Sequence, residues 1–142
     1  MARKRDVSKT KLFRMVQYCD YFDAKFRPTI QDCREVFRQV NRQVFNNELK
    51  MPKFRLVYSK EFWGECVGDM DDATVVTIRM NKSFLSRRLF INTMAHEMVH
   101  QWEYLHYENM THGRTFFVWR DQLEKFNITL SRHYRAKHYR LD

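Results

Sequence analysis

The sequence has 142 residues, 44% of them hydrophobic and 15% aromatic, and its 26 Lys and Arg against 17 Asp and Glu give a net charge of +9. A chain of this length can bury one core, so we expect a single domain over residues 1–142. No apolar run reaches the length of about 18 residues that a membrane helix needs, and no signal-peptide core follows the basic start. These features exclude a membrane protein and favour an intracellular one, in the cytoplasm, nucleoid or nucleus.

Two helices are predicted in the first third of the chain. Apolar residues recur at helical spacing over residues 8–26, and Pro28 ends this run. Residues 29–32 have the form of a capping box and begin a second helix, which the asparagines at 46–47 end. The apolar stripes of both helices are expected to pack in the core.

Three β-type runs follow, at residues 54–58, 62–67 and 74–80. The segment 68–72 contains glycine and aspartates and is typical of a hairpin turn between the last two runs. It lacks the ligand spacing and the terminal Glu of a calcium loop. We therefore expect a small three-stranded sheet that is mainly antiparallel.

The next stretch, residues 83–108, carries the pattern of a helix with no Pro or Gly, and within it lies His96-Glu97-Met98-Val99-His100. Histidines four apart on a helix lie on one face, so both imidazoles can bind one ion. A zinc ion with an open position lowers the pKa of its water to about 7, and a nearby carboxylate such as Glu97 can take the proton. The alternative is a helix whose histidines only pack or form ordinary hydrogen bonds.

A catalytic zinc usually has three protein ligands, and the candidates for the third are His106, His112, His133 and His138. His106 falls on another face if the helix continues. His112 is better placed, because the helical pattern lapses before it and Gly113 permits a sharp turn. Cys19, Cys33 and Cys66 are odd in number and widely spaced, so we expect reduced thiols rather than disulfides or metal ligands.

A final helix is indicated by the apolar residues Phe116, Trp119, Leu123 and Phe126. The order of elements is then helix, helix, three strands, metal-binding helix, turn, helix. This order predicts the α+β class.

The motif His96-Glu97-Met98-Val99-His100, followed by the H-G-R-T-F-F element at 112–117, resembles the SprT-like metalloproteases, the family of the Spartan proteases that act on DNA–protein crosslinks. The segments 63–66 and 77–81 resemble two strands of that family, and the similarity covers residues 29–127. It implies a zincin-like core, His112 as the third zinc ligand, and one Zn²⁺ per chain. It also implies a substrate extended along a sheet edge, for which the expected guide is the strand at 74–80, with Val75, Thr77 and Arg79 beside the peptide.

The predicted reaction is zinc-assisted hydrolysis of a peptide bond in a protein bound or crosslinked to DNA. His96, His100 and His112 hold the ion, and Glu97 is the general base. A further group should stabilise the oxyanion, and Tyr104, Tyr107 and His106 are the candidates.

Basic residues gather at both ends of the chain, where they can bind the phosphates of nucleic acid. Tyr134 and Tyr139 lie among them and could stack on bases. The alternative is a pair of solvated basic tails that only aid solubility. The predicted DNA contacts are Arg3, Lys4, Arg5, Arg132, Arg135, Lys137 and Arg140.

Two other functions remain open at this point. The chain could be a basic protein that binds nucleic acid or a host factor, with a zinc site and little or no proteolysis. It could also be a general peptidase indifferent to DNA. The intact Glu97 favours an enzyme, since a structural zinc site needs no unliganded carboxylate beside the ion. The sequence leaves the oligomeric state open.

Overall fold

The computed structural model describes residues 5–19 and 24–135. The elements within these ranges follow in the order α1 (Lys11–Tyr18), α2 (Ile30–Gln43), β1 (Lys53–Val57), β2 (Gly64–Gly68), β3 (Val76–Asn81), α3 (Arg87–Tyr107), α4 (Arg114–Phe117) and α5 (Arg120–Glu124). The predicted α+β class is therefore confirmed.

The two N-terminal helices begin at side-chain caps. Thr10 caps α1, and Thr29 caps α2 through the predicted capping box, in which Asp32 accepts a hydrogen bond from the Thr29 N–H. Helix α1 is shorter than expected, because it ends at Tyr18 and Phe26 instead forms an isolated β-bridge with Phe84. The bridge ties the segment before α2 to the segment before α3.

The sheet has the strand order β1-β3-β2, with β3 in the middle. The hairpin pair β2–β3 is antiparallel as predicted, but β1 runs parallel to β3. The three-stranded sheet is thus mixed rather than mainly antiparallel. Alternation of apolar and polar residues shows which face of a strand is buried, but it carries no information on which strand lies beside it.

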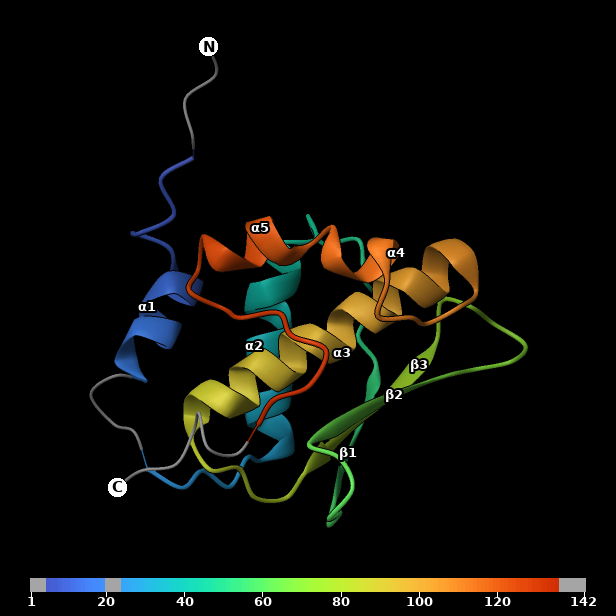
Figure 1. The fold of residues 1–142 in the computed structure, drawn as a ribbon, viewed down its shortest axis with the longest axis horizontal. Helices are drawn as coiled ribbons and strands as arrows, with labels where there is room; N and C mark the ends of the chain where they lie inside the picture. Colours follow the sequence, from blue (N-terminus) through green and yellow to red (C-terminus); the bar gives the residue numbers. More distant parts are fainter. Residues whose placement is uncertain (1–4, 20–23, 136–142) are drawn as a thin grey trace.

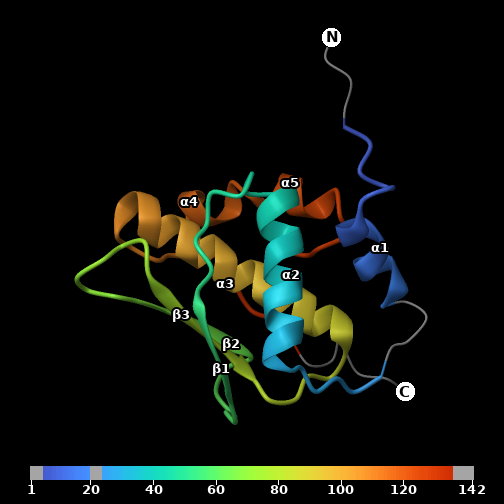
Figure 2. The same ribbon diagram turned by 180° about the vertical axis from the view of Figure 1, so that it is seen from behind.

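Helix α3 is the central element, and every residue from Leu89 to Gln101 is buried. It lies between α2 on one side and the C-terminal segment on the other, with the sheet packed along it (Figures 1 and 2). Because α3 is covered on several sides, apolar residues occur on more than one face of the helix rather than in a single stripe.

Glycines allow β2 to approach α3 closely. A Cβ added at Gly64 would lie 2.7 Å from Thr93 Cγ2, and one at Gly68 would overlap the ring of Tyr104. No side chain fits at either position without a shift, so these two glycines set the distance between β2 and the helix that carries the metal-binding motif.

The C-terminal helix is broken into α4 and α5 rather than continuous. Phe116, Leu123 and Phe126 are buried as predicted, while Trp119 lies between the two helices and packs on Trp102, with ring centroids 5.1 Å apart. After α5, the chain turns back across α3 (Figure 1). None of the helices described is both long and apolar enough to span a bilayer.

Candidate metal centre and active site

Three imidazoles meet at one point. The Nε2 atom of His100 lies 3.2 Å from that of His96 and 3.1 Å from that of His112, and the His96 and His112 Nε2 atoms are 3.2 Å apart. The three residues together are a group that could hold a metal ion. The structure thus brings together the three predicted ligands.

The spacing of these nitrogens suits zinc. A tetrahedral Zn²⁺ with Zn–N bonds of about 2.0–2.1 Å separates its nitrogen ligands by roughly 3.3–3.4 Å. The observed separations of 3.1 and 3.2 Å are close to this value, so a small outward displacement of the three rings is enough to reach it. Three neutral nitrogen donors are also a usual set for a catalytic zinc with one position left for water.

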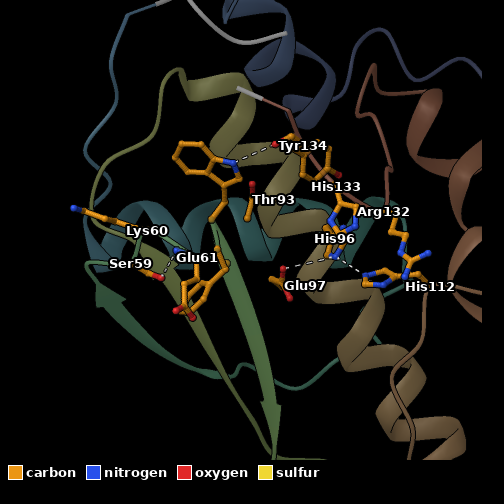
Figure 3. Close-up of a pocket in the computed structure, with 13 residues that line it drawn as sticks. Ser59, Lys60, Glu61, Thr93, His96, Glu97, His112, Arg132, His133 and Tyr134 are labelled. Carbon is orange, nitrogen blue, oxygen red and sulfur yellow. Dashed lines mark hydrogen bonds and ion pairs between the residues drawn. The ribbon is translucent and has the colours of Figure 1, made fainter. Parts of the chain in front are cut away.

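Two elements deliver the ligands. His96 and His100 lie one turn apart on α3, and the helix ends at Tyr107, followed by the C-cap residue Glu108, whose φ of 53° is in the left-handed region. The chain then turns back so that His112, just before α4, faces the helix (Figure 3). His106 points elsewhere and pairs with Glu48 at 2.7 Å, whereas the His133 ring lies 6.4 Å from that of His112. His138 lies outside the described residues.

The ligands have outer partners that the sequence did not reveal. The Nδ1 atom of His96 is 2.9 Å from the Ser131 carbonyl oxygen, and Nδ1 of His100 is 2.9 Å from Oε1 of Glu103. Each partner accepts a hydrogen bond from Nδ1 and leaves Nε2 available for a metal, as is usual around bound zinc. The only signal for Glu103 in the sequence was its position three residues after His100, on the same face of the helix.

Phe116 forms the floor of the centre. Its ring centroid lies 4.8 Å from those of His96 and His100 and 5.0 Å from that of His112, and its side chain is fully buried. One aromatic ring therefore packs against all three imidazoles and limits their rotation.

Burial keeps the imidazoles neutral. It lowers the pKa of His96 to about 3, with a further contribution from His100 and His112, and it is also the main cause of the lowered pKa values of His100 and His112. A neutral imidazole is the form that binds a metal, so little proton release is needed on binding near neutral pH.

Glu97 lies beside the three nitrogens without joining them. Its Oε2 atom is 4.0 Å from His96 Nε2, and the backbone N–H of Cys66 in β2 donates to its carboxylate. Burial raises the pKa of Glu97 to about 8, and the nearby Glu65 acts in the same direction. A carboxylate in such surroundings is a stronger base than one in water, which suits proton transfer near pH 7.

A cleft of about 600 Å³ opens over the site (Figure 3). One wall is residues 59–64, which lead into β2, and the other is residues 132–134, with Thr93, His96, Glu97 and His112 at the base. The second wall is fixed because the Tyr134 hydroxyl bonds the carbonyl oxygens of Thr129 and Asn92, and Trp63 Nε1 donates to the Tyr134 carbonyl oxygen. The cleft is therefore held between the sheet side and the C-terminal segment.

None of the predicted oxyanion donors lines this cleft. The Tyr104 hydroxyl donates to the Asp69 carbonyl oxygen at 2.6 Å, Tyr107 is exposed, and His106 pairs with Glu48. All three lie in the last two turns of α3, past the metal ligands, and the helix carries them away from the cleft. Arg132 and His133 line the cleft instead.

The predicted guide strand is also wrong. Thr77 and Arg79 belong to β3, which has β1 on one side and β2 on the other, and Val75 precedes the strand. Both edges of β3 are used in the sheet, so it cannot pair with a peptide. Among the described strands, β2 is the one that lies beside Glu97 and is also at an edge of the sheet.

The predicted nucleic-acid contacts fall into different places. Arg5 bonds the side chain and the carbonyl oxygen of Gln43, Arg135 is exposed, and Arg132 lines the cleft beside His112 (Figure 3). The others, Arg3, Lys4, Lys137 and Arg140, lie outside the described residues. Of the predicted contacts within the described residues, Arg132 is the one that lines the cleft.

Comparison with known proteins gives a family. Among curated proteins, no match reaches significance. The model of the SprT-like family matches residues 33–137, which is most of the chain and includes every residue of the metal centre. This chain belongs to the SprT-like family.

Proposed function

We propose that the chain is a zinc-dependent endopeptidase whose substrates are proteins bound or crosslinked to DNA. The observation that carries the proposal is the convergence of three Nε2 atoms beside a buried carboxylate that is not one of the ligands. A site built only to hold a metal would close the fourth position with another side chain. SprT-like membership supports the same activity.

The roles of the residues follow from their positions. His96, His100 and His112 hold the ion, which when bound activates a water molecule and polarises the scissile carbonyl. Glu97 accepts a proton from the attacking water and passes it to the leaving amine. The Cys66 N–H orients the Glu97 carboxylate, so the base is fixed by the strand that borders the cleft.

The substrate peptide is proposed to pair with the outer edge of β2. An extended peptide there would cross the cleft above Glu97, and its backbone would supply most of the binding contacts. Arg132 and His133, on the opposite wall, are the side chains available to hydrogen-bond the developing oxyanion.

The substrate proteins are proposed to be bound or crosslinked to DNA. Support comes from the net charge of +9, from the exposed Arg135 and from the family. Basic residues near the cleft would bring the protease to proteins that are already on the nucleic acid.

The test compares wild type with Glu97→Gln, using Glu124→Gln on the exposed face of α5 as the control. We expect all three proteins to bind one zinc, and Glu97→Gln to lose about 10²–10⁴-fold in the rate of cleavage of a DNA-crosslinked protein. Full activity in Glu97→Gln would show that Glu97 is not the general base. Equal rates of cleavage of the free and the DNA-bound protein would be consistent with peptidase activity but would contradict the proposed role of DNA.

A further inference from the structure

Glu103 is a fully buried carboxylate outside the set of residues that the reaction uses. It lies on α3 three residues after His100, and none of its surface is exposed. Burial of a carboxylate is strongly unfavourable unless hydrogen bonds replace those it makes with water. An apolar residue would fill this space at lower cost, so we look for the role of Glu103 in the hydrogen bonds that it makes.

Those contacts join two segments of the metal centre. Oε1 of Glu103 lies 2.9 Å from His100 Nδ1 and accepts from the Thr111 N–H at 3.1 Å. Oε2 accepts from the Thr111 hydroxyl at 2.9 Å and from the Thr115 hydroxyl at 2.5 Å. The Glu103 side chain thus contacts His100 directly. It also contacts the chain on both sides of His112, since Thr111 directly precedes His112 and Thr115 lies in α4.

The contact with His100 selects a tautomer. Oε1 of Glu103 accepts from the Thr111 N–H, and an acceptor oxygen 2.9 Å from Nδ1 favours the His100 tautomer that carries its proton on Nδ1. In the neutral ring, Nε2 is then an acceptor, and this is the atom that faces Nε2 of His96 and His112. The proton is placed where it does not compete with a metal.

The contacts with Thr111 and Thr115 fix the turn. After Glu108 the chain leaves α3, and nothing in the local sequence obliges it to return with His112 facing the helix. Two donors from Thr111 and one from Thr115 anchor the turn on the carboxylate from both sides of His112. The third ligand is therefore positioned through the same group as the second.

We propose that Glu103 is a positioning residue of the metal centre that orients His100 and His112 together and so sets the affinity for the ion. The inference rests on the metal site and not on proteolysis. It can fail while the peptidase proposal stands, and the reverse is also true.

The first test measures zinc affinity by competition with a chromophoric chelator for wild type, Glu103→Gln and Glu124→Gln. Glutamine keeps the size of the side chain but presents an NH₂ group to donors, so it cannot accept every hydrogen bond that Glu103 accepts. We expect zinc binding about 10–100-fold weaker in Glu103→Gln and unchanged in Glu124→Gln. The midpoint of thermal unfolding of the zinc-free proteins is measured in parallel, because a purely structural role would lower that midpoint and leave the affinity of the folded protein unchanged.

The second test reads the tautomer directly. Long-range ¹H–¹⁵N correlation spectra of the zinc-free protein, with the His100 signals assigned by their disappearance in His100→Asn, should show a proton on Nδ1 in wild type. We expect Glu103→Gln to show a mixture of tautomers. A proton on Nε2 of His100 in wild type would overturn the proposal, as would wild-type zinc affinity in Glu103→Gln.

Thr115→Val provides a variant that is expected to fold if Glu103→Gln does not. It removes one donor to Oε2 and leaves the His100 contact in place. We expect roughly a two- to tenfold loss of zinc affinity, the effect of one hydrogen bond. No loss would contradict the proposed anchoring of the turn.

Discussion

The chemistry of this protein depends on a few side chains whose surroundings set their properties. Buried imidazoles with lowered pKa values stay neutral, and a buried Glu97 with a raised pKa gains basicity. The pKa shifts of the imidazoles and of Glu97 run in opposite directions but have the same cause, because burial disfavours whichever form carries a charge. The site is thereby prepared both to bind a cation and to take up a proton.

Arg132 allows a prediction that separates catalysis from DNA binding. Arg132 and Arg135 are both exposed, but Arg132 lines the cleft beside His112 and Arg135 does not. If Arg132 stabilises the oxyanion, Arg132→Ala should lower kcat on a DNA-free peptide by about tenfold to a hundredfold with a smaller change in KM. Arg135→Ala is the matched control.

The measurement is steady-state hydrolysis of a fluorogenic peptide at fixed zinc concentration. Equal kcat values for Arg132→Ala and Arg135→Ala would show that Arg132 does not act on the reacting carbonyl. In that case His133, on the same wall of the cleft, becomes the residue to substitute next.

At the scale of elements, the important relation is the close contact between β2 and α3. Gly64 faces Thr93 and Glu97 on the helix, and the Cys66 N–H reaches Glu97 from the same strand. The strand that we propose for substrate pairing is therefore also the strand that orients the base. A change in its distance from α3 should disturb both functions.

Gly64→Ala tests this relation. The new Cβ would lie 2.7 Å from Thr93 Cγ2 and 3.2 Å from Glu97 Cγ. We therefore expect the free energy of unfolding to fall by about 1–3 kcal/mol, with a loss of peptidase activity. Thr93→Ser removes the Cγ2 atom that causes the closest contact. The double variant should regain stability and activity, as measured by urea unfolding and peptide hydrolysis.

Failure of Thr93→Ser to rescue Gly64→Ala would mean that the cost comes from the backbone rather than from the contact with α3. Thr93→Ser alone is the control, and its own effect is subtracted in a double-mutant cycle. Additive effects of the two substitutions would argue against the proposed packing.

At the scale of the whole molecule, the C-terminal segment contributes both basic residues, Arg132 and Arg135, and one wall of the cleft. Residues 129–134 are fixed to α3 and to Trp63, and the last three of them form a wall of the cleft. Removal of this segment would damage the site itself. An experiment on DNA binding must therefore leave the chain intact as far as Arg135.

We predict that deletion of residues 136–142, combined with neutral replacements of Arg3 and Lys4, weakens DNA binding and leaves hydrolysis of a DNA-free peptide unchanged. For each phosphate that the protein no longer neutralises, the slope of log affinity against log salt should decrease in magnitude by about 0.9 on duplex DNA. Fluorescence anisotropy over a series of salt concentrations measures both the affinity and the slope. An unchanged slope would place the DNA-binding surface elsewhere on the molecule.

Much of this molecule could be predicted from local sequence. The capping box at Thr29 and Asp32 fixes the start of α2 because both bonds are made within four consecutive residues. The spacing of His96 and His100 fixes their common face because a helix repeats every 3.6 residues or so. The α+β class follows from the order of such segments, and the family resemblance follows from the motifs at 96–100 and 112–117.

The tertiary structure decided what depends on neighbours distant in the chain. The parallel pairing of β1 with β3 leaves β2 at the edge beside Glu97, and no periodicity within a strand reports its partner. Helix α3 continues as far as Tyr107 and so places Tyr104 away from the cleft, whereas the return of residues 132–134 brings Arg132 to it. Local patterns thus determined which groups can bind a metal and take a proton. Long-range packing determined which strand borders them and which side chains complete the site, because those contacts form only when segments far apart in sequence are folded together.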